Sequence, residues 1–270
     1  MKEYKRTNVY ETADEKTMKA IFDYAEGYKK FLGECKTERE ACAYIVEEAE
    51  KKGYKQFDFS EKVKKGDKLY YNNRGKAVFI IKIGTGDVKK DGIRIVGSHI
   101  DNPRLDLKQV PLYEDNGVAF AKTHYYGGIR KYQWAAIPLA LHGVVAKKNG
   151  EVVTVKIGEE DSDPVFYVSD LLPHLAAKQN AKTLGEAIEG ENLNIWLGNI
   201  PYGEKEDDKT VKKNLLKILE EKYGIEEEDF LSAELSLTPS FKPKDIGFDR
   251  ALVGGYGHDD RVCSYAAFTA

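Results

Sequence analysis

The sequence contains no hydrophobic run long enough to cross a lipid bilayer. Its longest nearly apolar stretch extends from Trp134 to Ala146 and is interrupted by Pro138 and His142. Because a membrane helix needs about 20 consecutive apolar residues, we expect no membrane partner. The first six residues are mostly charged and lack the apolar centre of a signal peptide. Together these absences predict a cytoplasmic protein.

Cysteine is scarce, and neither sign of charge dominates. The 3 cysteines among 270 residues have neither the spacing of a metal site nor that of a disulfide framework. Lys and Arg number 42 and Asp and Glu 45, a formal net charge of −3, and the two signs are mixed along the chain. Without a basic stripe, we expect no nucleic-acid partner.

Helical and strand patterns alternate over the first part of the chain. Apolar residues recur at helical spacing over 11–32, and a capping-box pattern opens a second helix, expected over 38–53. Strands are expected at 69–71 and 77–81, joined by a tight turn, and again at 93–96 and 105–108. The apolar run at 93–96 is typical of a strand buried on both faces. The pattern predicts an α/β fold with a central mixed sheet flanked by helices.

The region from about 110 to 238 has a different sequence pattern, which we interpret as a mainly β insert. Two strand–turn–strand patterns carry Asn-Gly at the bend, at 116–117 and 149–150. A helix is expected near 169–180, a strand at 192–197 and an amphipathic helix at 211–223. We therefore expect 1–109 and 239–270 to form one α/β domain, interrupted by 110–238.

His99 and Asp101 stand where the 93–96 strand is expected to end. Ligands of α/β sheets collect beyond the carboxyl ends of strands, and a metal-binding imidazole usually donates its second N–H to a carboxylate. The His-x-Asp pattern is therefore a candidate metal site. The alternative is a histidine at the end of a strand, followed by a turn-forming Asp-Asn-Pro sequence.

Asp259 and Asp260 form a second candidate site, where a glycine-rich loop leads into a helix. Adjacent carboxylates offer hard oxygen ligands to a divalent cation. Aspartate is also favoured at helix N-termini, so helix capping is the alternative.

Taken together, three motifs resemble the aspartyl aminopeptidase/aminopeptidase I family of dinuclear zinc exopeptidases. They are Gly97-Ser98-His99-Ile100-Asp101, Tyr126-Gly127-Gly128-Ile129, and Gly255-Tyr256-Gly257-His258-Asp259-Asp260-Arg261-Val262-Cys263. The resemblance extends over nearly the whole chain. It implies the fold of a zinc exopeptidase and a metallo-aminopeptidase that hydrolyses the N-terminal bond of peptide substrates.

The resemblance also implies roles for individual residues. His99 would ligate one of two divalent metal ions, zinc by family analogy, with cobalt or manganese as alternatives. Asp101 would be the catalytic-site carboxylate that holds this histidine. Asp259 would bridge both ions, and its bond to Asp260 would be a cis peptide bond. His258 and Asp260 are candidates for supporting the ligands.

Other family features bear on substrates, partners and the extent of the chain. The insert mediates dimerisation in the family, so a homo-oligomer, a dimer or a dodecamer, is implied. His174 in the insert would contribute to a neighbour's substrate site, unless it is a buried residue at the start of a helix. The general base and remaining ligands follow Asp260 in the family. We therefore expect these 270 residues to be the N-terminal portion of a longer enzyme.

Two alternative functions remain at the level of sequence. One is a metal-free oligomeric scaffold with the peptidase fold, and the other is a related dinuclear deacylase or carboxypeptidase. The sequence does not identify the preferred N-terminal residue. Arg104, Arg130 and Lys131 are candidates for attracting an acidic side chain, but solvated surface charge explains them equally well.

Overall fold

A computed structural model describes residues 3–203 and 208–270 of the chain. The chain divides into two compact units: Met1–Ile100 joined by Lys242–Ala270, and the continuous segment Asp101–Phe241. From the sequence we expected an insert over 110–238, and these domain boundaries stay a prediction. The assignment of the insert as a dimerisation or lid domain stays a prediction.

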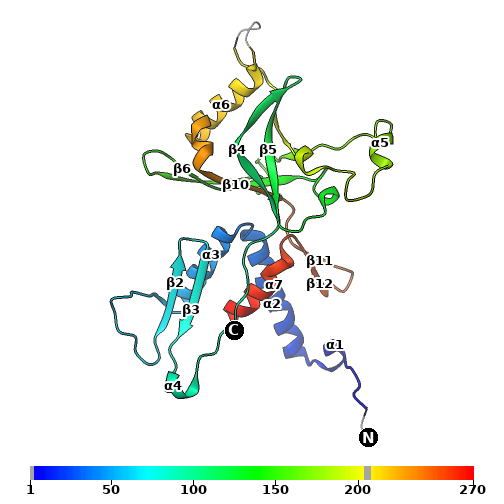
Figure 1. The fold of residues 1–270 in the computed structure, drawn as a ribbon. Helices are drawn as coiled ribbons and strands as arrows, with labels where there is room; N and C mark the ends of the chain where they lie inside the picture. The colour runs from blue at the N-terminus through cyan, green and yellow to red at the C-terminus, as the bar shows by residue number, and fades with distance from the viewer. Residues whose placement is uncertain (1–2, 204–207) are drawn as a thin grey trace. The chain divides into compact units, whose positions relative to one another are not determined.

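The first unit combines helices with two small sheets (Figure 1). Strands β1 and β2 pair in parallel, whereas β2 and β3 pair antiparallel, and β11 and β12 form a separate antiparallel pair. Helix α3 packs on β2 and β3, and helix α2 packs on both α3 and α7. The elements are α1 (Val9–Thr12), α2 (Glu15–Glu34), α3 (Glu38–Lys51), β1 (Lys55–Gln56), β2 (Lys68–Asn73), β3 (Ala77–Lys82), α4 (Val88–Asp91), β11 (Lys244–Ile246), β12 (Leu252–Gly254) and α7 (His258–Thr269).

The core of the first unit draws on both ends of the chain. Phe31 of α2 is fully buried, and its ring lies 5.6 Å from the ring of Tyr265 and 5.4 Å from that of Phe268, both on α7. Leu32 of α2 and Ile45 of α3 belong to the same apolar cluster. Segments more than 200 residues apart in the chain therefore need one another to exclude water.

The second unit is built on a seven-stranded antiparallel sheet in the order β7-β6-β10-β4-β5-β9-β8. Phe166, next to β8, forms a bridge with Leu139 at the start of β6, so the sheet curls back on itself. Helix α6 packs on β4, β5 and β9. The elements are β4 (Arg104–Asp115), β5 (Val118–Tyr126), η1 (Lys131–Gln133), β6 (Leu139–Ala146), β7 (Val152–Ile157), β8 (Tyr167–Val168), α5 (Ala177–Asn180), η2 (Gly190–Asn192), β9 (Ile195–Gly198), α6 (Thr210–Tyr223), η3 (Glu227–Ser232) and β10 (Ala233–Pro239).

Local sequence signals explain many of these elements, and the predicted α/β class is confirmed. Thr37 and Glu40 form the expected capping box at the start of α3. Asn116 and Gly117 join β4 to β5 with φ angles of 48° and 73°, the positive values that a tight hairpin turn of this kind requires. Helix α6 ends at Gly224, which adopts the left-handed conformation that glycine tolerates.

Two predicted elements are wrong. Residues 93–96 form no strand, and Ile93, Ile95 and Val96 are exposed, because the described residues place no strand beside them. The helix expected over 169–180 is reduced to α5, since Pro173 disfavours helical backbone at the residue before it. The apolar pattern at 93–96 therefore identified a hydrophobic segment correctly, but this segment does not pair with another strand in the described residues.

Candidate metal centre

His99 and Asp259 meet in the first unit, although 160 positions separate them in the sequence. The His99 Nε2 atom lies 3.0 Å from Asp259 Oδ1 and 3.9 Å from Asp260 Oδ2. The His99 side chain is 51% exposed and that of Asp259 86%, so both ligand atoms face an accessible surface. The spatial convergence that the two motifs required is present.

The backbone around Asp259 departs from helical geometry just where a ligand would be presented. Gly257 has a φ of 89° in the left-handed region, and Asp259 and Asp260 both have non-helical backbone angles. The Asp259–Asp260 peptide bond is cis, as the resemblance implies. Regular helix resumes at Arg261, so the two carboxylates stand on an irregular first turn of α7.

His258 is held by the helical core of the same unit. Its Nδ1 atom lies 2.8 Å from the Tyr28 hydroxyl on α2, and the two rings are 5.7 Å apart. Burial raises the pKa of Tyr28 to about 12, so the hydroxyl keeps its proton well into the alkaline range. The Tyr28 contact was missed from the sequence because a lone tyrosine on an apolar helix face resembles ordinary core.

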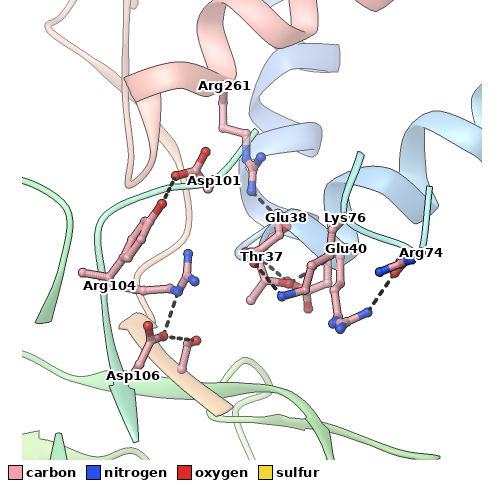
Figure 2. A network of polar contacts seen from close by, with 12 residues as sticks. Thr37, Glu38, Glu40, Arg74, Lys76, Asp101, Arg104, Asp106 and Arg261 are labelled. Atoms are coloured by element: carbon pink, nitrogen blue, oxygen red, sulfur yellow. Dashed lines mark hydrogen bonds and ion pairs between the residues drawn. The ribbon is translucent and has the colours of Figure 1, made fainter. Parts of the chain in front are cut away.

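Asp101 belongs to the second unit, where its carboxylate accepts a 2.7 Å hydrogen bond from the Tyr126 hydroxyl. The Arg104 guanidinium lies 4.3 Å above the Tyr126 ring, and its Nε donates to Asp106 Oδ1 at 2.8 Å. Ser236 on β10 donates to the same oxygen at 2.6 Å. Figure 2 shows Asp101, Arg104 and Asp106 in this chain of polar contacts. The role of Asp101 toward His99 stays a prediction.

His174 lies in a turn before α5 and is exposed. The expectation of a buried histidine at a helix start is therefore wrong, because α5 begins only at Ala177, beyond Pro173. The contribution of His174 to a neighbour's substrate site stays a prediction.

The donor set of His99 and Asp259 fits a zinc ion. Imidazole nitrogen and carboxylate oxygen both bind zinc at about 2.0–2.2 Å, so two ligands of one tetrahedral ion lie roughly 3.4 Å apart. The observed 3.0 Å between the two atoms is close to that separation. Among residues 3–203 and 208–270, no group of three or more His, Cys, Asp or Glu side chains converges as a complete metal site. The described residues thus provide a ligand pair.

The fold and this ligand pair define the class as an α/β protein with a candidate metal site. The family model for the aminopeptidase I zinc metalloprotease (M18) matches residues 31–270. The chain belongs to this family, as the three sequence motifs predicted.

Several M18 aminopeptidases are similar to this chain over nearly its whole length. A probable M18 family aminopeptidase 1 of Clostridium acetobutylicum is 51% identical, over 100% of this chain and 58% of its own length. The crystal structure of an M18 aminopeptidase from Thermotoga maritima is 40% identical with a TM-score of 0.91, over 98% of this chain and 57% of that one. Aminopeptidase I of C. acetobutylicum, also solved, is 47% identical with a TM-score of 0.87, over 100% of this chain and 59% of that one. The chain thus spans a little under three fifths of the length of these relatives.

No helix within the described residues is both long and apolar enough to pass through a membrane.

Proposed function

We propose that the protein carrying this chain is a zinc-dependent aminopeptidase that hydrolyses the N-terminal bond of peptide substrates. The observation that carries the proposal is the 3.0 Å approach of His99 Nε2 to Asp259 Oδ1 in a chain of the M18 family. Bound zinc supplies Lewis-acid activation of water and of the scissile carbonyl. The number of ions is part of the proposal, and we expect two.

The residues of the chain have separate tasks in this proposal. Neutral His99 would offer the Nε2 lone pair to one ion, and the exposed Asp259 carboxylate would present its two oxygens to both ions. Asp101 would accept the second N–H of the His99 imidazole and so fix its orientation and tautomer. Its own orientation is supported by the hydrogen bond from Tyr126.

The test compares metal content and substrate class in the complete gene product. We expect two equivalents of zinc, cobalt or manganese per chain in the parent, and a loss of metal together with at least 100-fold lower activity in H99A and D259N. The matched control is H124A, which removes an exposed histidine from β5. An aminoacyl chromogenic amide should be cleaved and an N-acyl amino acid should not. A metal-free parent would indicate the scaffold, and the reverse substrate preference a deacylase or carboxypeptidase.

We also propose that the protein assembles as a homo-oligomer in the cytoplasm. The solved mApe1 dodecamer shares the fold at 21% identity and a TM-score of 0.68, and it supports this assembly by analogy. Light scattering after gel filtration tests the proposal, and a monomeric mass at micromolar concentration would contradict it. If His174 serves a neighbour's site, H174A should raise KM while leaving the assembly intact.

A further inference from the structure

Arg261 is the largest fully buried side chain among the described residues, with 0% of its surface exposed. It begins the regular part of α7, two positions after Asp259. Burial of a guanidinium carries a large desolvation cost unless hydrogen bonds satisfy its donors. The acceptors that these donors contact therefore indicate which segments the buried guanidinium holds together.

Within the described residues, Arg261 donates hydrogen bonds to three main-chain carbonyls. Its Nε donates to Cys35 O at 3.2 Å, its Nη2 to Thr37 O at 2.9 Å, and its Nη1 to Ile100 O. Figure 2 shows the guanidinium directed toward the segment that carries Thr37. One planar group thus joins three segments: the start of α7, the junction of α2 and α3, and the residue that follows His99.

The acceptors at the junction of α2 and α3 are themselves fixed. Glu40 Oε2 accepts from the main-chain N–H groups of Lys36 and Thr37, both at 2.9 Å. On its other side the guanidinium lies 5.7 Å from the centre of the Phe31 ring in the buried core. The capping box of α3 and the apolar core therefore provide a rigid frame for the guanidinium.

The contact with Ile100 indicates that Arg261 does more than hold the helices together. Of the three bonds, those to Cys35 and Thr37 join α7 to the ends of α2 and α3, whereas Ile100 belongs to neither helix. The third bond joins the main-chain carbonyl of Ile100, the residue after His99, to the side chain of Arg261, which is two residues after Asp259. The guanidinium therefore sets the distance between the backbones that carry the two candidate ligands.

We infer that Arg261 is a positioning residue for the metal centre, holding the His99 and Asp259 backbones at the separation that one zinc ion requires. The inference rests on the proposed metal site. Lysine is no equivalent, because its ammonium is a compact charge without the planar fork of donors that reaches three carbonyls at fixed angles.

The experiment measures the zinc dissociation constant of the metal-depleted complete gene product by competition with a chromophoric chelator. We expect R261M and R261K each to weaken zinc binding by 10- to 100-fold, the range found when groups that orient metal ligands are lost. The matched control is Y265L, which disturbs the packing of α7 on the same core but touches none of the three carbonyls. Y265L should lower the thermal midpoint and leave the zinc dissociation constant within twofold of the parent.

Parental zinc affinity in R261K would overturn the inference, as would an equal loss of affinity in Y265L. If R261M does not fold, the zinc dissociation constant of R261K decides the question, with the same 10- to 100-fold weakening expected. H99A and D259N separate this result from the proposed function. If both keep parental zinc affinity, the proposed site is wrong; if both lose zinc and the Arg261 variants do not, only the positioning role is wrong.

Discussion

The Tyr126 hydroxyl orients a carboxylate that the reaction is proposed to need. It donates a 2.7 Å hydrogen bond to the Asp101 carboxylate, and its ring lies beneath the Arg104 guanidinium. A hydrogen bond to a charged group contributes about 1.5–3 kcal/mol, so its loss leaves the carboxylate less well oriented.

We therefore expect Y126F to lower kcat/KM about tenfold or more, with little change in the thermal midpoint. The measurement is steady-state hydrolysis of an aminoacyl amide by the complete gene product. Y125F is the control, because it removes a hydroxyl from the neighbouring residue, whose ring stacks on His124. Equal kinetics in Y126F and the parent would show that Asp101 does not depend on this bond.

At the same scale, the sequence indicated some site residues and missed others. His99 and Asp259 were singled out by the resemblance of three motifs to one family, since each of their own motifs alone also fits a strand end or a helix cap. The contacts of Arg261 could not be predicted, since its acceptors are main-chain carbonyls, which every residue possesses. The bond between Tyr28 and His258 was equally hidden, because tyrosine on an apolar helix face predicts only burial.

Among the elements, the capping box of α3 has a measurable contribution to stability. Glu40 accepts hydrogen bonds from the main chain of Lys36 and Thr37, which would otherwise lack these acceptors at the helix start. We expect E40A to lower the free energy of unfolding by about 1–2 kcal/mol, measured by urea denaturation. E47A is the control, because it removes only an exposed ion pair on the same helix. Equal effects of the two substitutions would contradict this role.

The ion pair between Lys29 on α2 and Asp245 on β11 predicts a pH dependence. The two groups are 2.5 Å apart and largely shielded from solvent. Hydrogen bonding to Lys29, and to a lesser degree to Arg250, lowers the pKa of Asp245, and hydrogen bonds to Asp245 and Glu26 raise the pKa of Lys29. The pair therefore stabilises the fold above the unfolded pKa of aspartate, about 3.9, and below that of lysine, about 10.4. Its contribution is lost as the pH falls through the lowered value or rises through the raised one.

D245N should accordingly lower the thermal midpoint by the same amount throughout pH 5–9, and the difference from the parent should shrink in acid. Thermal melts at pH steps from 2 to 9 measure this. D23N supplies the comparison, since Asp23 pairs with Lys19 on the exposed face of α2. A difference that grows as the pH falls would contradict the assignment.

Elements with local signals were predictable, and those that depend on neighbours were not. Helix α3, helix α6 and the two Asn-Gly hairpins carry their own caps or turns, so short-range chemistry specifies them. The apolar run at 93–96 carries equally strong strand propensity, yet a strand forms only when another segment supplies hydrogen-bond partners. The composition of the segment 93–96 could not show that no neighbouring strand pairs with it in the described residues.

At the scale of the whole molecule, the two units differ in how the chain builds them. Asp101–Phe241 is one continuous segment with its own curled sheet, whereas the first unit joins Met1–Ile100 to Lys242–Ala270. The core around Phe31 requires Tyr265 and Phe268 from the distant end. Contacts between such distant segments form late, because a long loop must close first.

We therefore expect a fragment of residues 101–241 to unfold cooperatively on its own, and a fragment of residues 1–100 to show no sharp thermal transition. Circular dichroism melts of the two fragments test this, with the 270-residue chain as reference. A disordered 101–241 fragment would refute the independence of the second unit, and a cooperative 1–100 fragment would refute the dependence of the first unit on its distant segment.

The exposed run from Ile93 to Val96 has a consequence for how this 270-residue chain, taken by itself, behaves in concentrated solution. Ile95 is 84% exposed, and the segment combines β-branched side chains with an absence of proline. Segments of this composition are prone to stack copy upon copy into cross-β ribbons when nothing shields them. In such a ribbon we expect Arg94 to oppose fibre growth, because its charge would be repeated at every layer.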